Sequence, residues 1–153
     1  MSNKKINTLL GWASFLVAAI TYYLTAERTA SFWDCGEFIS ASYHLQVVHP
    51  PGAPLFLMLG NLFSQFASGP EGVAFSVNML SVVTSALCVM FTFWTITHFA
   101  EKLLAKGGQE EGTKRILIYG AGLVGALALT FTDTFWFSAV EAEVYAASSF
   151  LSA

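Results

Sequence analysis

The stretch Val73–Phe99, VAFSVNMLSVVTSALCVMFTFWTITHF, decides the fold class. It contains no Asp, Glu, Lys or Arg, and it exceeds the roughly 20 apolar residues with which a helix crosses a bilayer. The whole 153-residue chain is 55% hydrophobic and 11% charged, where a soluble domain is about a quarter charged. We therefore expect an all-α integral membrane protein. A net charge of -3 with seven Lys and Arg residues argues against nucleic acid as a partner.

Two further stretches, about 8–26 and 116–132, are also expected to span the membrane. Lys4 and Lys5 precede the first one, which favours a cytoplasmic N-terminus. A cleaved signal peptide is the competing interpretation. The first apolar run is longer than a typical signal-peptide core and more apolar segments follow, so we expect a retained helix.

Two shorter segments separate the first two full spans. Residues 37–48 alternate apolar and polar side chains as a helix at the membrane interface does, and the run His49-Pro50-Pro51-Gly52 is expected to stop this helix. Residues 55–67 are apolar but short for a crossing helix, which indicates an interfacial or re-entrant helix. The polar loop 101–115, rich in Lys, then lies in the cytoplasm.

This topology predicts a multi-spanning helical bundle with interfacial helices between its first two full spans. Residues 1–153 form the N-terminal part of one transmembrane domain in this interpretation, because Ala146–Ala153 look like the start of another helix. In the span 116–132, the glycines of Gly120-Ala121-Gly122-Leu123-Val124-Gly125 are expected to allow close helix packing.

Asp34 and Glu37 lie three residues apart just beyond the first span. The spacing fits a capping box that only starts a helix, and on spacing alone this account is as good as a functional one. Their position favours function, because carboxylates at a membrane boundary are costly unless they face water, a partner or a ligand. They could act as a general base, or hold a divalent cation that binds a phosphate.

Glu141 and Glu143 emerge on the same outer side as Asp34 and Glu37 in this topology. On a helix, residues two apart point to nearly opposite sides, so we expect at most one of this pair to face the site. We favour Glu143, with Glu141 closing a second capping box that begins at Ser138.

Two residues beside these acids, His49 and Trp33, complete the candidate site. His49 precedes two prolines that hold it in place, so its imidazole could orient a phosphate or an acid. Trp33 is expected to anchor at the membrane interface, and the sequence permits it to border a sugar or lipid groove. Cys35 has no obvious His partner, and we do not expect a catalytic cysteine.

Two motifs together resemble a known family. They are Trp33-Asp34-Cys35-Gly36-Glu37-Phe38-Ile39 with His49-Pro50-Pro51-Gly52-Ala53-Pro54, and the later run from Trp136 to Tyr145. They are similar to two signatures of a membrane protein family once described only as a domain of unknown function and now linked to protein O-mannosyltransferases. Cys35 stands where that family often has Ser.

The resemblance implies a glycosyltransferase of GT-C type that uses a polyprenyl-phosphate sugar donor within membrane lipid. It implies an essential acid in the first external loop, which falls on Asp34 with Glu37 beside it as the catalytic residues. It also implies acids in the second external loop, which match Glu141 and Glu143. With His49 and Trp33 these acids form the predicted substrate-binding set. The need for a metal stays open.

We expect from this a transferase that moves mannose or a similar hexose to a hydroxyl on a protein or glycan. The expected location is the bacterial inner membrane with the active site on the periplasmic face. A transporter or a non-catalytic assembly subunit would explain the same composition. A transporter usually shows polar residues or helix breaks in mid-span, whereas the spans here carry only Ser, Thr, Asn and Gly.

Overall fold

A computed structural model describes residues 3–105 and 110–153, and every regular element in these residues is helical. The elements are α1 (Asn3–Thr25), α2 (Cys35–His44), α3 (Pro54–Ser64), the 3-10 helix η1 (Pro70–Gly72), α4 (Val73–Leu104), α5 (Glu111–Thr130), α6 (Asp133–Val140) and α7 (Val144–Ser152). The helices α1, α4 with η1, and α5 are each long and apolar enough to cross a membrane. The expected all-α integral membrane fold is confirmed.

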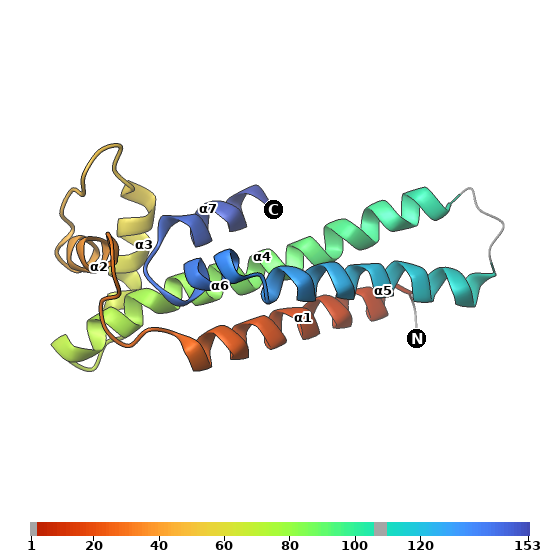
Figure 1. Ribbon diagram of the computed structural model, residues 1–153, viewed down its shortest axis with the longest axis horizontal. Coiled ribbons are helices and arrows are strands. Elements are labelled where there is room, and N and C mark those ends of the chain that lie inside the picture. The colour runs from red at the N-terminus through yellow and green to blue at the C-terminus, as the bar shows by residue number, and fades with distance from the viewer. Residues whose placement is uncertain (1–2, 106–109) are drawn as a thin grey trace.

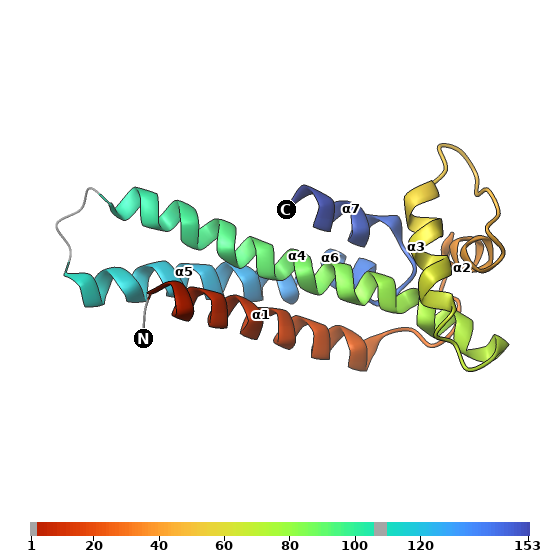
Figure 2. The same ribbon diagram turned by 180° about the vertical axis from the view of Figure 1, so that it is seen from behind.

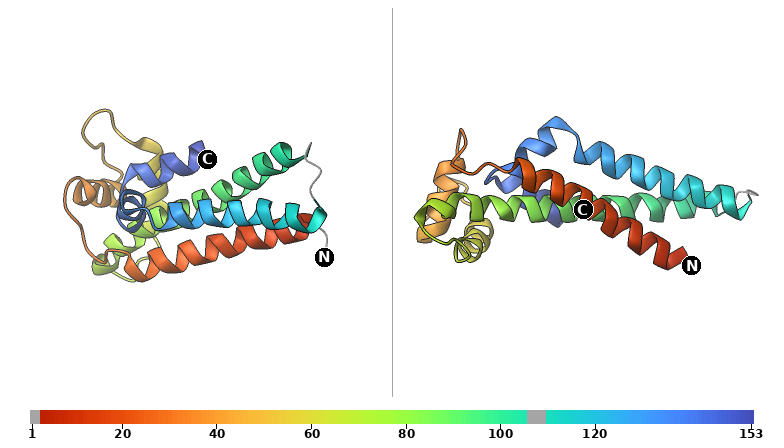
Figure 3. Two further views of the ribbon diagram at one scale, coloured as in Figure 1. Left: turned by 45° about the vertical axis from the view of Figure 1, so that its right-hand side comes forward. Right: turned by 90° about the horizontal axis from the view of Figure 1, so that it is seen from below.

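The bundle is arranged around α4, which packs against every other helix (Figure 1). α1 and α5 both run antiparallel to α4, and α1 crosses it at an angle in the view from below (Figure 3). α2, α3 and α6 gather toward one end of the bundle, and α7 turns back along α4. The view from behind shows the same grouping (Figure 2). Segments far apart in the sequence thus meet at one end of the molecule.

Glycine allows α5 to approach α4 closely. A Cβ atom on Gly122 would lie 2.7 Å from Thr97 Cγ2 and 2.8 Å from Phe93 Cε2, and a Cβ on Gly125 would collide with Ile96. A Cβ on Gly120 would meet no atom within 4 Å. The predicted packing role therefore holds for two of these three glycines.

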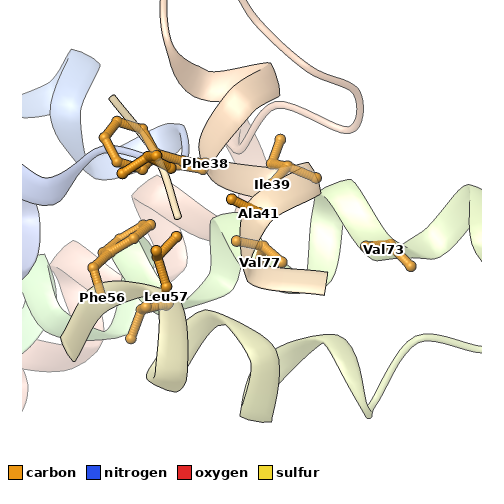
Figure 4. Packing of buried hydrophobic residues seen from close by; sticks show 10 residues of the cluster. Phe38, Ile39, Ala41, Phe56, Leu57, Val73 and Val77 are labelled. Carbon is orange, nitrogen blue, oxygen red and sulfur yellow. The ribbon is translucent and has the colours of Figure 1, made fainter. Parts of the chain in front are cut away.

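A compact apolar core fixes α2 and α3 to the start of α4. Its buried residues are Phe38, Ile39, Ala41, Val48, Phe56, Leu57, Val73, Val77, Leu80 and Ala142. Phe38 and Phe56 meet edge to face with ring centroids 5.5 Å apart (Figure 4). Because Ala142 belongs to this core, the connection between α6 and α7 is held against the same end.

Several helix boundaries differ from the sequence predictions. α2 ends at His44 and not at Val48, because Leu45 takes a left-handed conformation with φ 52°. The N–H groups of Leu45 and Gln46 donate to the carbonyls of Ser42 and Ala41, which is a Schellman motif. The helix therefore ends before the proline run is reached.

α4 continues through Leu104, and α5 begins at Glu111, so both ends of the expected polar loop 101–115 are helical. The residues after Phe99 are good helix formers, which explains the extension. Residues 106–109 of that loop lie outside the described part of the chain. The span predicted to end at residue 132 ends at Thr130, and the separate helix α6 follows, which the sequence did not suggest.

α3 lies beside α2 at one end of the bundle and does not run its length (Figure 1). After Ser64, i to i+3 hydrogen bonds continue as tighter turns to Ala67, which matches the predicted segment 55–67. Because α1 and α4 are antiparallel, α2 and α3 add no traverse of the bundle between them. The placement of α3 in the membrane itself stays a prediction.

Candidate functional site

His49 and Glu37 form the best defined contact of the site. The imidazole Nδ1 lies 2.8 Å from Glu37 Oε2, and the backbone N–H of His49 donates to Glu37 Oε1 at 2.8 Å. Glu37 stands on the first turn of α2, and His49 follows in the connection to α3. This double contact fixes the imidazole ring beside the first turn of α2.

Asp34 lies on the other side of the same imidazole, with its Oδ2 3.8 Å from His49 Nε2. It occupies the N-cap position of α2, but its side chain makes no capping hydrogen bond. The predicted capping box is therefore absent: Glu37 accepts from His49, and the Asp34 carboxylate stays exposed. The Asp34 carboxylate is open to a ligand, whereas both carboxylate oxygens of Glu37 already accept hydrogen bonds from His49.

The electrostatics of the pair follow from this contact. The His49 imidazole, as hydrogen-bond donor and as charge, lowers the pKa of Glu37 below its usual 4.5. The hydrogen bond to Glu37 and the negative charges of Glu37 and Asp34 raise the pKa of His49 above its usual 6.5. An ionised Glu37 and a protonated His49 are therefore each favoured by the other.

Glu141 and Glu143 stand on the connection between α6 and α7, and both face the site. Glu143 N–H donates to the Glu141 carbonyl at 2.9 Å, which closes a three-residue turn around buried Ala142. Side-chain atoms of both acids lie within 4.8 Å of each other and of Cys35 Sγ, so both side chains point toward the loop before α2. The expectation that only one of them faces the site is wrong, because this segment is not helical.

The second capping box is also absent. Ser138 lies inside α6 and donates to the Thr134 carbonyl at 3.3 Å, and Glu141 accepts a short hydrogen bond from the Ser31 hydroxyl. Ser31 precedes α2, so this bond joins the two acid-bearing loops directly.

Cys35 makes a second contact between those loops. Its buried Sγ lies 3.8 Å from Glu143 Oε1. Burial is the main reason that the pKa of the thiol is raised to about 11; a hydrogen bond with Ser31 lowers it in part, and the charges of Glu141 and Glu143 raise it further. A protonated, buried thiol is a poor nucleophile, which agrees with the expectation that Cys35 is not catalytic.

Glu143 differs from the exposed acids because it is half-buried. Burial raises the pKa of its carboxyl above 4.5, and the negative charges of Glu141 and Asp34 raise it further. Groups with opposing pKa shifts in one site are a common sign of divided acid and base roles.

The acids form two sets that suit a cation by composition. In the exposed set Asp34, Glu37 and His49, and in the more buried set Cys35, Glu141 and Glu143, one possible ligand atom of each residue lies within 4.8 Å of the others. The exposed set is already joined by its own hydrogen bond. A divalent cation on these oxygens is compatible with the geometry, and it stays a prediction.

Trp33 borders a cleft of about 610 Å³. Its walls also include Phe32, Phe137 and Glu141, and Trp33 itself is 93% exposed with φ 62°. A left-handed backbone is uncommon for a bulky residue, and such strain is often found at ligand sites. The groove that the sequence permitted beside Trp33 is present, with Glu141 at its edge.

The structure thus brings Asp34, Glu37, His49, Glu141 and Glu143 to one end of the bundle, with Trp33 beside them. His44 is not part of this group; its ring packs against Tyr43. Sequence reasoning missed Ser31, whose place before α2 gave no signal.

Comparison with known proteins gives a family. A family model described as the protein O-mannosyl-transferase TMEM260 N-terminal domain matches residues 34–153. The chain is 26% identical over 132 residues to the protein O-mannosyl-transferase tmem260 of Dictyostelium discoideum, and 31% identical over 134 residues to the protein O-mannosyl-transferase TMEM260 of Mus musculus.

These matches cover 86% and 87% of this chain but 14% and 16% of the relatives. No solved structure matches the chain. The matched family segment includes Asp34, Glu37, His49, Glu141 and Glu143. Because the family model covers most of the chain, the chain belongs to the protein O-mannosyl-transferase TMEM260 N-terminal domain family.

Proposed function

We propose that the chain is the N-terminal part of a membrane glycosyltransferase of GT-C type. It moves mannose or a similar hexose from a polyprenyl-phosphate donor to a hydroxyl group on a protein. The observation that carries the proposal is the contact between two acid-bearing loops. Ser31 and Cys35, from the segment that carries Asp34 and Glu37, contact Glu141 and Glu143 after α6. The names of the two relatives support the same reaction class.

Asp34 is the general base in this proposal. As the acceptor oxygen attacks the sugar C1, Asp34 takes the hydroxyl proton, the bond from C1 to the acceptor forms, and the bond from C1 to the donor phosphate breaks. The phosphate leaves readily, so the protein's task is to place the reactants and handle one proton and the charge. The carboxylate of Asp34 is exposed and makes no capping bond, as this role requires.

His49 and Glu37 support Asp34. The imidazole lies between the two carboxylates and is held by Glu37. A protonated imidazole there stabilises the Asp34 carboxylate and offers positive charge to the donor phosphate. The cleft beside Trp33 and Glu141 is the proposed place for the sugar or the acceptor. A divalent cation on the carboxylates would add charge stabilisation at the phosphate.

For the setting, we propose the bacterial inner membrane with the N-terminus in the cytoplasm and the site on the periplasmic face. Lys4, Lys5, Lys102, Lys114 and Arg115 lie at the bundle end opposite the site. The tendency of cytoplasmic loops to carry Lys and Arg supports this orientation.

The test is the Asp34→Asn substitution in the full-length protein. The assay measures transfer of radiolabelled hexose from polyprenyl phosphate to protein. Loss of a general base should lower transfer by roughly 10²- to 10⁴-fold, with expression unchanged. Asp133→Asn is the matched control, because this acid lies at the same end of the bundle outside the cluster. Unchanged transfer in Asp34→Asn rejects the assignment. Solute uptake, or obligate co-purification without transfer, would favour a transporter or an assembly subunit.

A further inference from the structure

Asn78 is a buried polar residue on α4 that reaches the loop after α1. Its side chain is 1% exposed. Its Nδ2 donates to the Glu27 carbonyl at 2.7 Å, and the Thr29 carbonyl lies 3.5 Å from the same nitrogen. The orientation of the amide follows from chemistry, because both neighbours are carbonyl acceptors and only the NH₂ group can donate.

Glu27 is tied on its other side to the second acid-bearing loop. Its backbone N–H donates to the Val140 carbonyl at 2.9 Å. Val140 ends α6 and directly precedes Glu141. A single residue of the first loop thus bonds α4 through its carbonyl and the end of α6 through its N–H.

The segment around Glu27 is also braced internally. The Glu27 carboxylate accepts hydrogen bonds from the N–H groups of Arg28 and Thr29 and from the Thr29 hydroxyl. These bonds lower the pKa of Glu27, so its carboxylate stays charged and keeps them. The turn that Asn78 holds is therefore a rigid unit, and its position sets the start of the chain that leads to Ser31 and Asp34.

The Asn78 amide contacts the loop through its donor end. Its Oδ1 is buried and has no hydrogen-bond partner among the described residues, so the hydrogen bonds found for this side chain are those from Nδ2 to the carbonyls of Glu27 and Thr29. A variant without the amide leaves the Glu27 carbonyl without this donor.

We propose that Asn78 is a positioning residue for the acid cluster. It sets the register of the loop carrying Asp34 against the connection carrying Glu141 and Glu143, and so fixes the separation of the acids. The catalytic part of this proposal, that Asn78 helps the acids to act, rests on the proposed transferase activity. The geometric part, that Asn78 joins two loops through Glu27, does not depend on any activity.

The geometric part is tested by amide hydrogen exchange of the membrane-reconstituted protein. Asn78→Leu removes the donor while keeping a buried side chain of similar size. We expect faster exchange at the Glu27 amide, which bonds Val140, and at the Glu143 amide. Thr84→Val is the matched control, because buried Thr84 on the same helix bonds only the carbonyls of Leu80 and Ser81. Unchanged exchange in Asn78→Leu would overturn the inference.

The catalytic part is tested by kinetics of the same variants. Misplacement of reacting groups by about 1 Å can cost roughly 100-fold in rate, so kcat should fall by about that amount in Asn78→Leu while KM for the donor stays near the wild-type value. A fall in donor affinity with unchanged kcat would contradict a positioning role.

Asn78→Asp adds a pH profile that a merely structural residue would not give. A protonated carboxyl can donate to the Glu27 carbonyl, whereas a carboxylate cannot. The activity of Asn78→Asp relative to wild type should therefore rise as pH falls, and taking the ratio removes the pH dependence that the two proteins share. The ratio for Asn78→Leu should stay flat. A flat ratio for Asn78→Asp would overturn the catalytic part.

The two proposals can fail separately. If no variant, including wild type, transfers sugar, and exchange still rises in Asn78→Leu, the transferase proposal fails and the joining of the loops stands. If wild type transfers sugar and Asn78→Leu changes neither exchange nor kcat, the transferase proposal stands and the role of Asn78 fails.

Discussion

At the scale of single residues, the site depends on how each titrating group changes its neighbour. His49 and Glu37 are exposed. The pKa of Glu37 is lowered mainly by its hydrogen bonds from the His49 ring and the His49 backbone N–H, and the pKa of His49 is raised mainly by the ring hydrogen bond and the charge of Glu37. Glu37 has a lowered pKa, so its contribution is lost as pH falls through that value. His49 has a raised pKa, so its contribution is lost as pH rises through that value. The ion pair of Glu37 and His49 is therefore intact from the pKa of Glu37, which lies below 4.5, up to the pKa of His49, which lies above 6.5.

This argument predicts the effect of Glu37→Gln on His49. The amide removes both the strong acceptor and the negative charge, so the pKa of His49 should fall toward its ordinary 6.5. The Asp34 charge remains and keeps part of the rise. NMR titration of the His49 ring checks this prediction. Glu71→Gln, at an exposed acid of the same bundle end, should leave the titration unchanged, and a similar fall there would show a general charge effect.

Glu143 carries the opposite kind of shift. Its raised pKa means that its favourable contribution to stability is present below pH 4.5 and is lost as pH rises through the raised value, when a half-buried carboxyl must ionise. Glu143→Gln should therefore stabilise the chain at neutral pH relative to wild type and make no such difference at pH 4.

Thermal unfolding in detergent at the two pH values measures this difference. The same substitution should lower transfer, because the second acid-bearing loop keeps the Glu141 carboxylate and loses that of Glu143. Glu71→Gln again serves as control, with no change in either quantity. Equal unfolding temperatures for Glu143→Gln and wild type at neutral pH would contradict the burial argument.

At the scale of elements, the long helices followed from composition and the short connections did not. Val73–Phe99 predicted a span because apolar length alone decides that case. The end of α2 was misplaced because a left-handed Leu45 has no signal in its residue type. Glu141 and Glu143 were assigned to a helix. That assignment was wrong because Ala142 is buried in the core with residues of α2, α3 and α4, and the chain makes a tight turn there.

The contact between α4 and α5 gives a prediction at this scale. Gly122→Ala places a methyl group against Thr97 and Phe93, and overpacking of this kind typically costs about 1–3 kcal/mol. Gly120→Ala is the matched control, because its added Cβ meets open space. Unfolding in a detergent titration should show a loss for Gly122→Ala alone. Equal stability of the two variants would mean that α5 can shift without cost.

At the scale of the whole molecule, the sequence predicted which acids lie at one end of the bundle better than it predicted the contacts around them. Placing Glu141 and Glu143 on the same side as Asp34 needed only the count of spans and the position of the Lys residues. The contacts of Ser31 with Glu141 and of Cys35 with Glu143 needed the packing of two loops more than 100 positions apart. No local pattern encodes such a contact, because it depends on the angle at which α1 crosses α4.

The membrane topology is the prediction that joins these parts. The proposed orientation puts residues before and after α3 on one side and the start of α5 on the other. Val47 lies before α3 and is 92% exposed, and Glu71 lies after α3. Single cysteines introduced as Val47→Cys and Glu71→Cys should both react with a membrane-impermeant maleimide added outside. Glu111→Cys at the start of α5 should react only after the membrane is opened.

Cys35 and Cys88 are both buried. Each single-cysteine variant also carries Cys35→Ala and Cys88→Ala, so that only the introduced cysteine can be labelled. If α3 crosses the membrane, Val47→Cys and Glu71→Cys label from opposite sides, and Glu111→Cys changes sides with the latter. If the whole orientation is inverted, all three labels exchange sides together. Only a crossing α3 would put the start of α4 and the loop that carries Asp34 on opposite sides of the membrane. It would also require α2 and α3 to leave the shared core with Val73 and Val77, which is why the packing of that core favours external labelling of both sites.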